Sequence, residues 1–371
     1  MDIGLPKEVK VQEYRVGLTP FNVGELVNEG HTVFVETQAG SGIGFSDSHY
    51  AANGAQIVEN SLEVFQRSKL IVKVKEPQPE EFDLLNDRHI LFTYLHLAPD
   101  PKQASALLKS GCAAIAYETV TCSQGTLPLL IPMSQVAGRL SIQAGAFALQ
   151  KQNGGSGVLL GGVPGVDFGK VVVIGGGVVG SNAIRMAIGR GAHVTVLEKS
   201  LTVLEDLDKL FGSRLNTLYS SKANLEKEIS SADLVVGAVL VPGAAAPRLL
   251  DKCLLKTMQP GSVLVDVAID QGGCFETSRP TTHENPLYAI DGILHYCVTN
   301  MPGAVPRTST LALNNATLPF VLEIANLGLV KALKNNSHLR NGLNVFKGEV
   351  THAQVASHLD LSFKDPLELL V

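Results

Sequence analysis

Short apolar runs alternate with amphipathic segments along the first third of the chain. The apolar runs are typical of buried strands, and the segments between them repeat hydrophobic residues at helical spacing. We predict strands at residues 2–5, 31–36, 69–75, 89–97 and 112–119, and helices at 19–29 and 101–110. Strands that alternate with helices predict a parallel sheet covered by helices.

A second alternating series begins at residue 170. It predicts strands at residues 170–174, 193–197, 216–220, 234–240, 262–269 and 295–298, the six strands of a complete Rossmann unit. Long helical stretches lie on both sides of this series, at 132–151 and 309–333. The tail from 342 to 361 predicts a short strand and a helix.

The two series predict two domains, as does the length of 371 residues. A separate module after residue 304 would be short of core, so we expect those residues to complete the first domain. The predicted fold is α/β, with two doubly wound Rossmann-like domains joined by long helices and an active-site cleft between them. The predicted domains are 1–130 plus 305–371 for the substrate and 131–304 for the cofactor.

A glycine fingerprint follows the apolar strand at 170–174. Gly175, Gly177 and Gly180 form G-x-G-x-x-G between this strand and a helical segment. In dinucleotide-binding proteins the three glycines permit a tight turn, the approach of a pyrophosphate and close helix packing. Glu198 ends the next strand, about 20 residues further on, where a carboxylate binds the adenosine ribose. An acid there repels a 2′-phosphate, so NAD is favoured over NADP, although Lys199 beside it weakens this preference.

Composition excludes several other classes of protein. The net charge of −5 and the absence of Lys/Arg clusters argue against a nucleic-acid surface. No run reaches the ~18 apolar residues of a membrane helix. Five cysteines without C-x-x-C spacing indicate reduced thiols of a cytoplasmic protein, and no export signal is expected. The histidines show no metal-ligand spacing, so we expect no catalytic metal.

Polar side chains follow several predicted strands, at the edge where open parallel sheets bind ligands. Arg15, Lys75 and His96 follow strands of the first series, and Asp270 follows the strand at 262–269. Each residue also has a structural reading. Arg15 could be a solvated surface residue, Lys75 alternates with Lys73 and could face solvent with it, and His96 could be a hydrogen-bonded core histidine.

Longer motifs resemble one known family. EYRVGLTP, KVKEPQPEE, FTYLHLAPD, PLLIPMSQVAGRLS and DQGGCFETSRPTTH are similar to segments of the NAD-dependent bacterial alanine dehydrogenases. The resemblance covers essentially the whole chain. The soluble nucleotide-binding subunit of proton-translocating transhydrogenase shares the fold and some of these motifs. The resemblance implies reversible oxidative deamination of L-alanine to pyruvate, ammonium and NADH.

The resemblance also implies roles for individual residues. Arg15 and Lys75 match the family's substrate-binding residues, and His96 and Asp270 match its catalytic pair. The implied cofactor residues, beside the three glycines, are Ser134, Val178, Val179, Glu198, Ser220, Val239, Leu240, Val267, Ala268, Ile269, Asp270, Arg279, Val298, Thr299, Asn300 and Met301. Some members bind magnesium through a Glu and a His on the C-terminal helix. Here Glu323 is followed four residues later by Leu327, so no such site is expected.

Two alternatives stay open beside an alanine dehydrogenase. One is the transhydrogenase subunit, a hydride carrier that needs membrane and NADP-binding partners. The other is a non-catalytic NAD-binding protein, against which the presence of Arg15, Lys75, His96 and Asp270 argues. The family's usual state implies a homohexamer that acts on small molecules, without nucleic acid or membrane.

Overall fold

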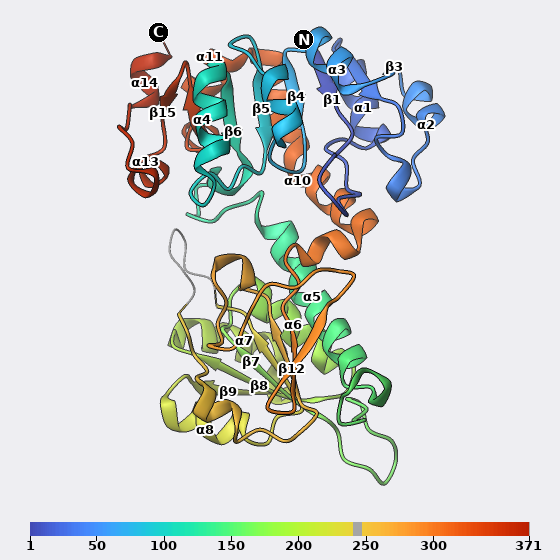
Figure 1. Cartoon of the computed structure of the whole chain (residues 1–371), viewed down its shortest axis with the longest axis vertical. Coiled ribbons are helices and arrows are strands. Elements are labelled where there is room, and N and C mark those ends of the chain that lie inside the picture. Colours follow the sequence, from blue (N-terminus) through green and yellow to red (C-terminus); the bar gives the residue numbers. More distant parts are fainter. Residues whose placement is uncertain (240–246, 371) are drawn as a thin grey trace. The chain divides into compact units, whose positions relative to one another are not determined.

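The computed structural model describes residues 1–239 and 247–370 of the chain. The chain divides into two compact units (Figure 1). Unit 1 consists of Met1–Met133 and Val305–Val371, and unit 2 consists of Ser134–Ala304. Each unit contains one mostly parallel sheet with helices beside it, so the predicted fold class is confirmed.

The sheet of unit 1 has the order β3-β2-β1-β4-β5-β6-β14-β15 among the described residues. Its strands are β1 (Asp2–Leu5), β2 (Thr32–Glu36), β3 (Gln56–Val58), β4 (Leu70–Val72), β5 (Ile90–Thr93), β6 (Ala113–Ala116), β14 (Leu343–Phe346) and β15 (Glu349–Val350). The first six pair in parallel, and β14 and β15 are antiparallel additions at one edge. The chain runs outward from β1 to β3 and then in the other direction from β4, so the strand order reverses between β1 and β4.

Helices of unit 1 connect these strands. They are α1 (Pro20–Asn28), α2 (Asp47–Ala52), α3 (Ser61–Arg67), α4 (Pro101–Ser110), α10 (Pro306–Leu327), α11 (Leu329–Asn335), α12 (Ser337–Arg340), α13 (Ala353–Leu359) and α14 (Pro366–Leu369). The predicted single helix at 309–333 is wrong. Gly328 adopts a φ of +75°, which glycine reaches without strain, and the two helices on either side of it are bent by 120°.

The sheet of unit 2 has the order β12-β13-β11-β10-β7-β8-β9. Its strands are β7 (Lys170–Ile174), β8 (His193–Glu198), β9 (Leu215–Tyr219), β10 (Leu234–Gly237), β11 (Val263–Asp266), β12 (Leu287–Ile290) and β13 (Ile293–Tyr296). Its helices are α5 (Ile131–Ala148), which begins in unit 1, α6 (Val178–Gly189), α7 (Leu201–Phe211), α8 (Lys222–Ile229) and α9 (Lys252–Leu255). Six strands are parallel, as predicted, and the antiparallel β12 was not predicted. The strand order reverses between β7 and β10.

The central strands of both sheets are buried on both faces, which explains their continuous apolar runs. In unit 1, Phe65, Leu91 and Leu107 belong to a core cluster between the sheet and its helices. In unit 2, Val172, Val235 and Leu264 form the corresponding cluster. Burying side chains of this size contributes about 1.5–3 kcal/mol each.

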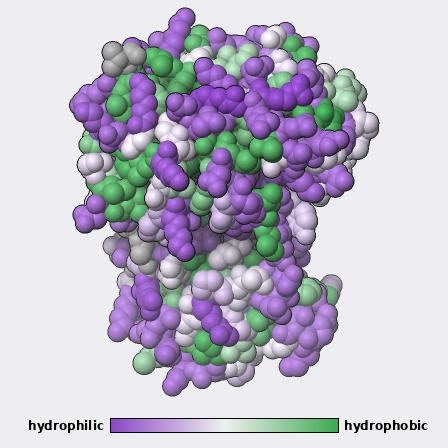
Figure 2. Space-filling view, turned by 45° about the horizontal axis from the view of Figure 1, so that its top comes forward, coloured by the Kyte–Doolittle hydropathy of each residue, from purple (hydrophilic) through white to green (hydrophobic). Residues whose placement is uncertain are grey.

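Hydrophilic side chains cover most of the face drawn in Figure 2, and hydrophobic residues form small separate patches on it. In the described part of the chain, no single helix is both long and apolar enough to cross a membrane. Only the bent pair α10 and α11 meets that test of length and composition, and only when the two are taken together.

Several strands end earlier than the apolar pattern predicts. β4, β5 and β11 end at Val72, Thr93 and Asp266, whereas the predicted strands ran to 75, 97 and 269. The apolar residues after β4 and β5, such as Val74 and Leu95, are buried in loops instead. Lys75, His96 and Asp270 therefore lie in loops three or four residues beyond their strands.

Candidate active site

Unit 1 gathers polar side chains at the carboxyl edge of its sheet, around the point where the strand order reverses. Arg15 lies in the loop after β1, and Lys75 lies in the loop after the neighbouring β4. His96 follows β5, and Glu118 follows β6 in the short 3-10 turn Tyr117–Thr119. Such a reversal leaves a crevice at the carboxyl ends of the strands, where open α/β sheets bind their ligands.

Arg15 is held by Glu13, two residues before it. The guanidinium donates from Nε to Glu13 Oε1 at 2.7 Å and from Nη2 to Oε2 at 2.6 Å. Both side chains are almost completely buried. Burial alone would raise the pKa of Glu13, but the contacts with Arg15 outweigh it and bring the pKa to about 2. Arg15 is therefore a fixed, charged group, and Nη1 also contacts Met133 Sδ at 3.1 Å.

Lys75 lies next to a buried ionic cluster formed by Lys73, Glu8 and Glu81. Lys73 Nζ is 2.7 Å from Glu81 Oε1 and 3.3 Å from Glu8 Oε2. Glu8 Oε1 accepts the backbone N–H groups of Val74 at 2.6 Å and Lys75 at 3.4 Å. The two lysines thus have different environments: Lys73 is fully buried and paired, whereas Lys75 is partly exposed.

The charge state of Lys75 depends on its surroundings. Burial lowers its pKa, and the positive charge of Arg15 lowers it further. This interaction also places the two cations near each other. Two adjacent cations, of which the guanidinium presents a planar fork, suit a small carboxylate ligand.

His96 has a strained backbone conformation and a side chain that is exposed to solvent. Its φ is +49°, an unusual value for a residue with a Cβ, and its side chain is 48% exposed. Glu118 Oε1 accepts the backbone N–H of His96 at 2.6 Å and also that of Leu95 at 3.2 Å. Oε1 lies 3.8 Å from His96 Nδ1, so Glu118 forms an ion pair with the protonated ring.

The imidazole of His96 stacks on the ring of Tyr94, with 5.7 Å between centroids and 3° between planes. Tyr94 is buried, and its hydroxyl donates to the Leu129 carbonyl at 2.6 Å. Burial raises the pKa of Tyr94, so this hydroxyl stays neutral. His96 is consequently an accessible imidazole that is fixed at its backbone and at one face of its ring. Histidine is the side chain that exchanges protons most readily near neutral pH.

Unit 2 presents its glycine turn at the corresponding reversal of its sheet. Gly175 has a φ of +99° directly after β7, and Gly177 caps the start of α6. A Cβ on Gly180 would come within 1.8 Å of the Gly175 carbonyl oxygen, so only glycine fits between strand and helix. A Cβ on Gly177 would meet no atom within 4 Å, which leaves space for a phosphate at the N-terminus of α6. These features fit a dinucleotide.

Glu198 is the last residue of β8 and is held by backbone N–H groups. Its Oε2 accepts Gly176 N at 2.7 Å, and its Oε1 accepts Lys199 N at 2.6 Å and Ser200 N at 2.9 Å. The carboxylate is thereby fixed beside the glycine turn. Ser220 follows β9 and donates its N–H to the Glu198 carbonyl at 3.0 Å, and Val239 follows β10. Leu240 lies outside the described residues.

Asp270 does not follow its strand directly, as the predicted strand at 262–269 implied, because β11 ends at Asp266. The acid that ends β11 is Asp266, which is fully buried and accepts from Cys274 N at 2.7 Å and Ser278 Oγ at 2.5 Å. Burial raises the pKa of Asp266, and it serves to fix the loop that follows. Asp270 lies within the 3-10 turn Ile269–Gln271 and is exposed. A carboxylate available to a ligand is therefore presented by this turn, rather than by the strand.

The other residues implied as cofactor-binding lie in unit 2. Val178 and Val179 open α6, and Val267 and Ala268 lead from β11 into the turn of Asp270. The Arg279 guanidinium lies over the Tyr288 ring, 4.3 Å from its centroid. Val298, Thr299, Asn300 and Met301 follow β13, and Ser134 lies in α5. Most of them thus follow parallel strands at the carboxyl edge.

The sequence analysis assigned no role to Glu13, Glu118 or Glu8. Glu13 and Glu118 hold Arg15 and His96, and Glu8 holds the backbone of Lys75. A signal was present for Glu8, three residues after the apolar run at 2–5, and for Glu118, at the end of the predicted strand at 112–119. The described residues contain no group of three or more His, Cys, Asp or Glu side chains that could hold a metal ion. Glu323 accepts a hydrogen bond from Asn336 Nδ2 at 2.8 Å.

Comparisons with known proteins show to which family the chain is similar. Residues 4–137 match the family described as "Alanine dehydrogenase/PNT, N-terminal domain", and residues 141–353 match "Alanine dehydrogenase/PNT, C-terminal domain". The chain is 54% identical to an alanine dehydrogenase of Halomonas elongata over 370 residues, covering 100% of both chains. It is 52% identical to an alanine dehydrogenase of Methanococcus maripaludis over 364 residues, covering 98% of both.

Solved structures show the same relationship. An L-alanine dehydrogenase superposes with a TM-score of 0.95 at 53% identity, covering 97% of this chain and 99% of that one. A transhydrogenase from Sinorhizobium meliloti superposes with a TM-score of 0.81 at 23% identity, covering 95% of this chain and 99% of that one. At that identity the second likeness shows the fold alone.

Proposed function

The chain belongs to the alanine dehydrogenase/PNT family, and from this premise we propose that it catalyses the NAD-dependent oxidative deamination of L-alanine. L-Alanine, NAD⁺ and water give pyruvate, ammonium, NADH and a proton, and the reaction is reversible. The observation that carries the proposal is the arrangement of Arg15, Lys75 and His96 at the strand-order reversal of unit 1.

Arg15 and Lys75 bind the substrate carboxylate in this proposal. Glu13 fixes the guanidinium through Nε and Nη2, so its orientation is set before the carboxylate binds. Lys75 supplies the second positive charge and then stabilises the oxygen that forms on Cα. In the reverse reaction its lowered pKa lets it donate a proton to the pyruvate carbonyl oxygen more readily than an ordinary lysine.

His96 moves the protons. It accepts one from the substrate ammonium, so that the nitrogen lone pair can assist departure of the hydride from Cα. After it has released that proton to solvent, it accepts one from the water that attacks the resulting iminium and gives this proton to the departing amine. Glu118 acts as a positioning residue, because its carboxylate fixes the His96 backbone and pairs with the ring when it is protonated.

NAD, held by Gly175, Gly177, Gly180 and Glu198, supplies the acceptor for the hydride. The space beside Gly177 and the fixed carboxylate of Glu198 support this assignment. Asp270 offsets the positive charge that develops on the substrate nitrogen, which requires its turn to reach the bound alanine. The remaining implied residues line the nucleotide in the same proposal.

The quaternary state and the compartment are proposed from the family resemblance and the cysteines. We expect a homohexamer of the 39.3 kDa chain, which light scattering after size-exclusion chromatography would measure. The five cysteines are free thiols, which fits the reducing cytoplasm.

Absorbance at 340 nm tests the activity, with purified protein, NAD and L-alanine at alkaline pH. The proposal predicts a rise that D-alanine or NADP does not reproduce. A flat trace from folded protein that still binds NADH would contradict it and favour a hydride carrier.

A further inference from the structure

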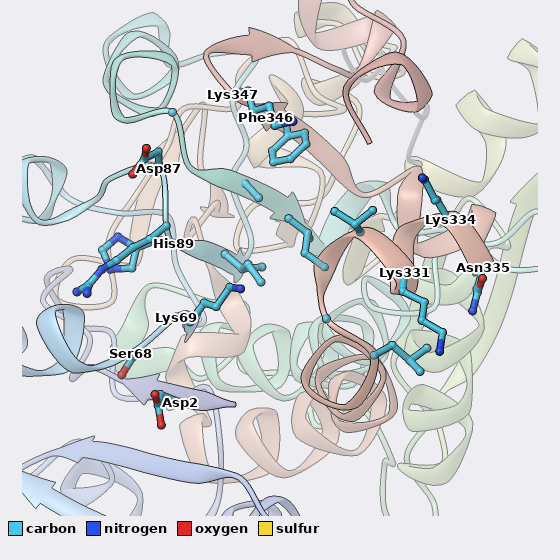
Figure 3. Close-up of a pocket in the computed structure, with 18 of the residues that line it drawn as sticks. Asp2, Ser68, Lys69, Asp87, His89, Lys331, Lys334, Asn335, Phe346 and Lys347 are labelled. Atoms are coloured by element: carbon cyan, nitrogen blue, oxygen red, sulfur yellow. The ribbon is translucent and has the colours of Figure 1, made fainter. Parts of the chain in front are cut away.

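A pocket of about 1200 Å³ lies in unit 1, at the amino edge of its sheet (Figure 3). Asp2 begins β1, and Lys69, His89 and Gly111 lie just before β4, β5 and β6. Residues from the end of α10 through α11 and from the turn after β14 complete its walls. Arg15, Lys75 and His96 follow the opposite ends of these strands, so the pocket is separate from the proposed substrate site.

The pocket is strongly basic. Six cationic residues contribute to its lining, and only two acidic residues do. The cations are Arg67, Lys69, Arg88, Lys331, Lys334 and Lys347, and the carboxylates are those of Asp2 and Asp87. The chain as a whole carries a net charge of −5, so this concentration of positive charge is local. It creates a field that attracts a small anion, while the rest of the surface repels a long polyanion such as nucleic acid.

Some of these cations are fixed. Arg88 Nη2 donates to the Phe65 carbonyl at 2.7 Å and the Gln66 carbonyl at 2.5 Å, and Lys347 Nζ donates to the Leu369 carbonyl at 2.8 Å. Others have no protein partner. The side-chain amines of Lys69, Lys331 and Lys334 form no hydrogen bond or ion pair with any residue that the structure describes.

The unpaired lysines come from different sides of the pocket. Figure 3 shows Lys69 on one side and Lys331 and Lys334 on another. Lys331 and Lys334 are three residues apart on α11, so they share one face of the helix. Cations that surround a cavity suit a ligand with charges along its length, because a single carboxylate could meet only one or two of them.

Apolar groups form the remaining wall. Leu329, Val330 and Phe346 line the pocket, together with the strand starts at Ile90 and Ala113. We propose that this pocket binds a polyphosphate group, either free or carried by a nucleotide whose base packs on the apolar wall. The phosphate oxygens accept from Lys69, Lys331 and Lys334, which form charge-assisted hydrogen bonds with them.

Calorimetric titration of the full-length protein with inorganic tripolyphosphate tests the proposal. The titration is done with NADH at saturation, so that the dinucleotide site of unit 2 is filled. One anion should bind per chain, and its affinity should fall with added salt. ADP titrated in the same way distinguishes the two sources, since tighter binding than tripolyphosphate indicates a nucleotide and weaker binding indicates the free anion.

The double variant Lys331→Glu/Lys334→Glu should weaken tripolyphosphate binding at least about tenfold, because it reverses two charges in the pocket. The matched control is Lys102→Glu/Lys109→Glu on α4, which reverses two exposed charges of the same unit outside the pocket. The control should bind as the original protein does. Both variants should retain NADH binding, which shows that they are folded.

Three results would overturn the proposal. The first is that tripolyphosphate does not bind to the unmodified protein at moderate salt, and the second is that both double variants weaken its binding equally. The third is that the oligomer becomes smaller in Lys331→Glu/Lys334→Glu and not in the control. The last result would show that a second copy of the chain covers the pocket. None of these measurements depends on turnover of alanine.

Discussion

The two units use the same strand order and build different chemistry at the point where that order reverses. In unit 1 the reversal between β1 and β4 carries charged side chains with carboxylates beside them: Glu13 pairs with the Arg15 guanidinium, and Glu8 accepts the backbone N–H of Lys75. In unit 2 the reversal between β7 and β10 carries glycines and backbone N–H groups, with Glu198 held by three of them. The fold supplies the place for a ligand, and the loops decide which ligand it takes.

This difference has a physical basis. A small zwitterion offers one carboxylate and one amine, so it has to be bound by a few strong, directed charges. A dinucleotide offers a long surface, so many backbone contacts at a helix N-terminus suffice. We therefore expect ligand binding by unit 1 to depend on single side chains, and ligand binding by unit 2 to depend on the conformation of its backbone.

The largest effect is expected from His96→Ala. Loss of proton transfer should lower kcat by about a thousandfold, while NADH affinity stays unchanged. Steady-state rates at 340 nm and NADH fluorescence titration measure the two quantities. His358→Ala, at an exposed position of α13, is the control and should behave as the original protein. If NADH affinity fell with kcat, the role of His96 would be structural.

Glu13→Gln should destabilise unit 1 by roughly 3 kcal/mol at neutral pH, since it removes the carboxylate charge that pairs with the buried Arg15 guanidinium. The pKa of Glu13 is lowered from 4.5 to about 2 in the folded protein. The stability that its charge contributes is thus complete above pH 4.5 and is lost as the pH falls toward 2.

Urea denaturation at several pH values checks the Glu13 prediction. The difference in free energy of unfolding between Glu13→Gln and the original protein should become smaller as the pH falls from 4.5 to 2. Glu59→Gln, at an exposed position of the same unit, should show no such difference at any pH. If this difference did not depend on pH, the lower stability of Glu13→Gln would come from altered packing and not from the lost charge.

Arg15→Lys should raise the KM for L-alanine by about 10- to 100-fold, because lysine cannot form the bidentate contact. The KM for NAD should stay within twofold. Lys7→Arg, an exposed change of a cation in the same unit, serves as the control. Equal increases in both KM values would contradict the separation of roles between the two units.

Gly177→Ala should have the smallest effect, a decrease in NADH affinity of about tenfold, because a methyl group enters the space left for the pyrophosphate. The melting temperature should not change, since that methyl group meets no protein atom within 4 Å. Gly189→Ala in the same helix also meets no atom and should leave NADH affinity unchanged. Unaltered affinity in Gly177→Ala would exclude close backbone contact with the cofactor.

The sequence predicted best what is encoded locally. The glycine turn, the strand at 170–174 and the helix at 101–110 depend on neighbouring residues, and the structure has them at those positions. Short edge strands were missed, because β3 and β12 have three and four residues and no clear alternation. The break at Gly328 could have been predicted, since a glycine inside a long helical pattern is a breaker signal.

For the candidate site, the pattern of strand ends predicted where Arg15, Lys75 and His96 would lie but not what holds them. Glu8 and Glu118 act through contacts between segments far apart in the sequence, and Glu13, two residues from Arg15, acts through the direction of its side chain. The difference between Lys73 and Lys75 has the same origin, since both follow an apolar run and only packing separates them. The roles of these residues in catalysis stay predictions.

Transfer of deuterium tests the central claim most directly. The protein is incubated with NAD and L-alanine deuterated at Cα, and the mass of the NADH formed is measured. If alanine bound by unit 1 gives its hydride to NAD bound by unit 2, the NADH carries one deuterium per molecule. NADH without deuterium would show that the hydride does not come from Cα and would contradict the account.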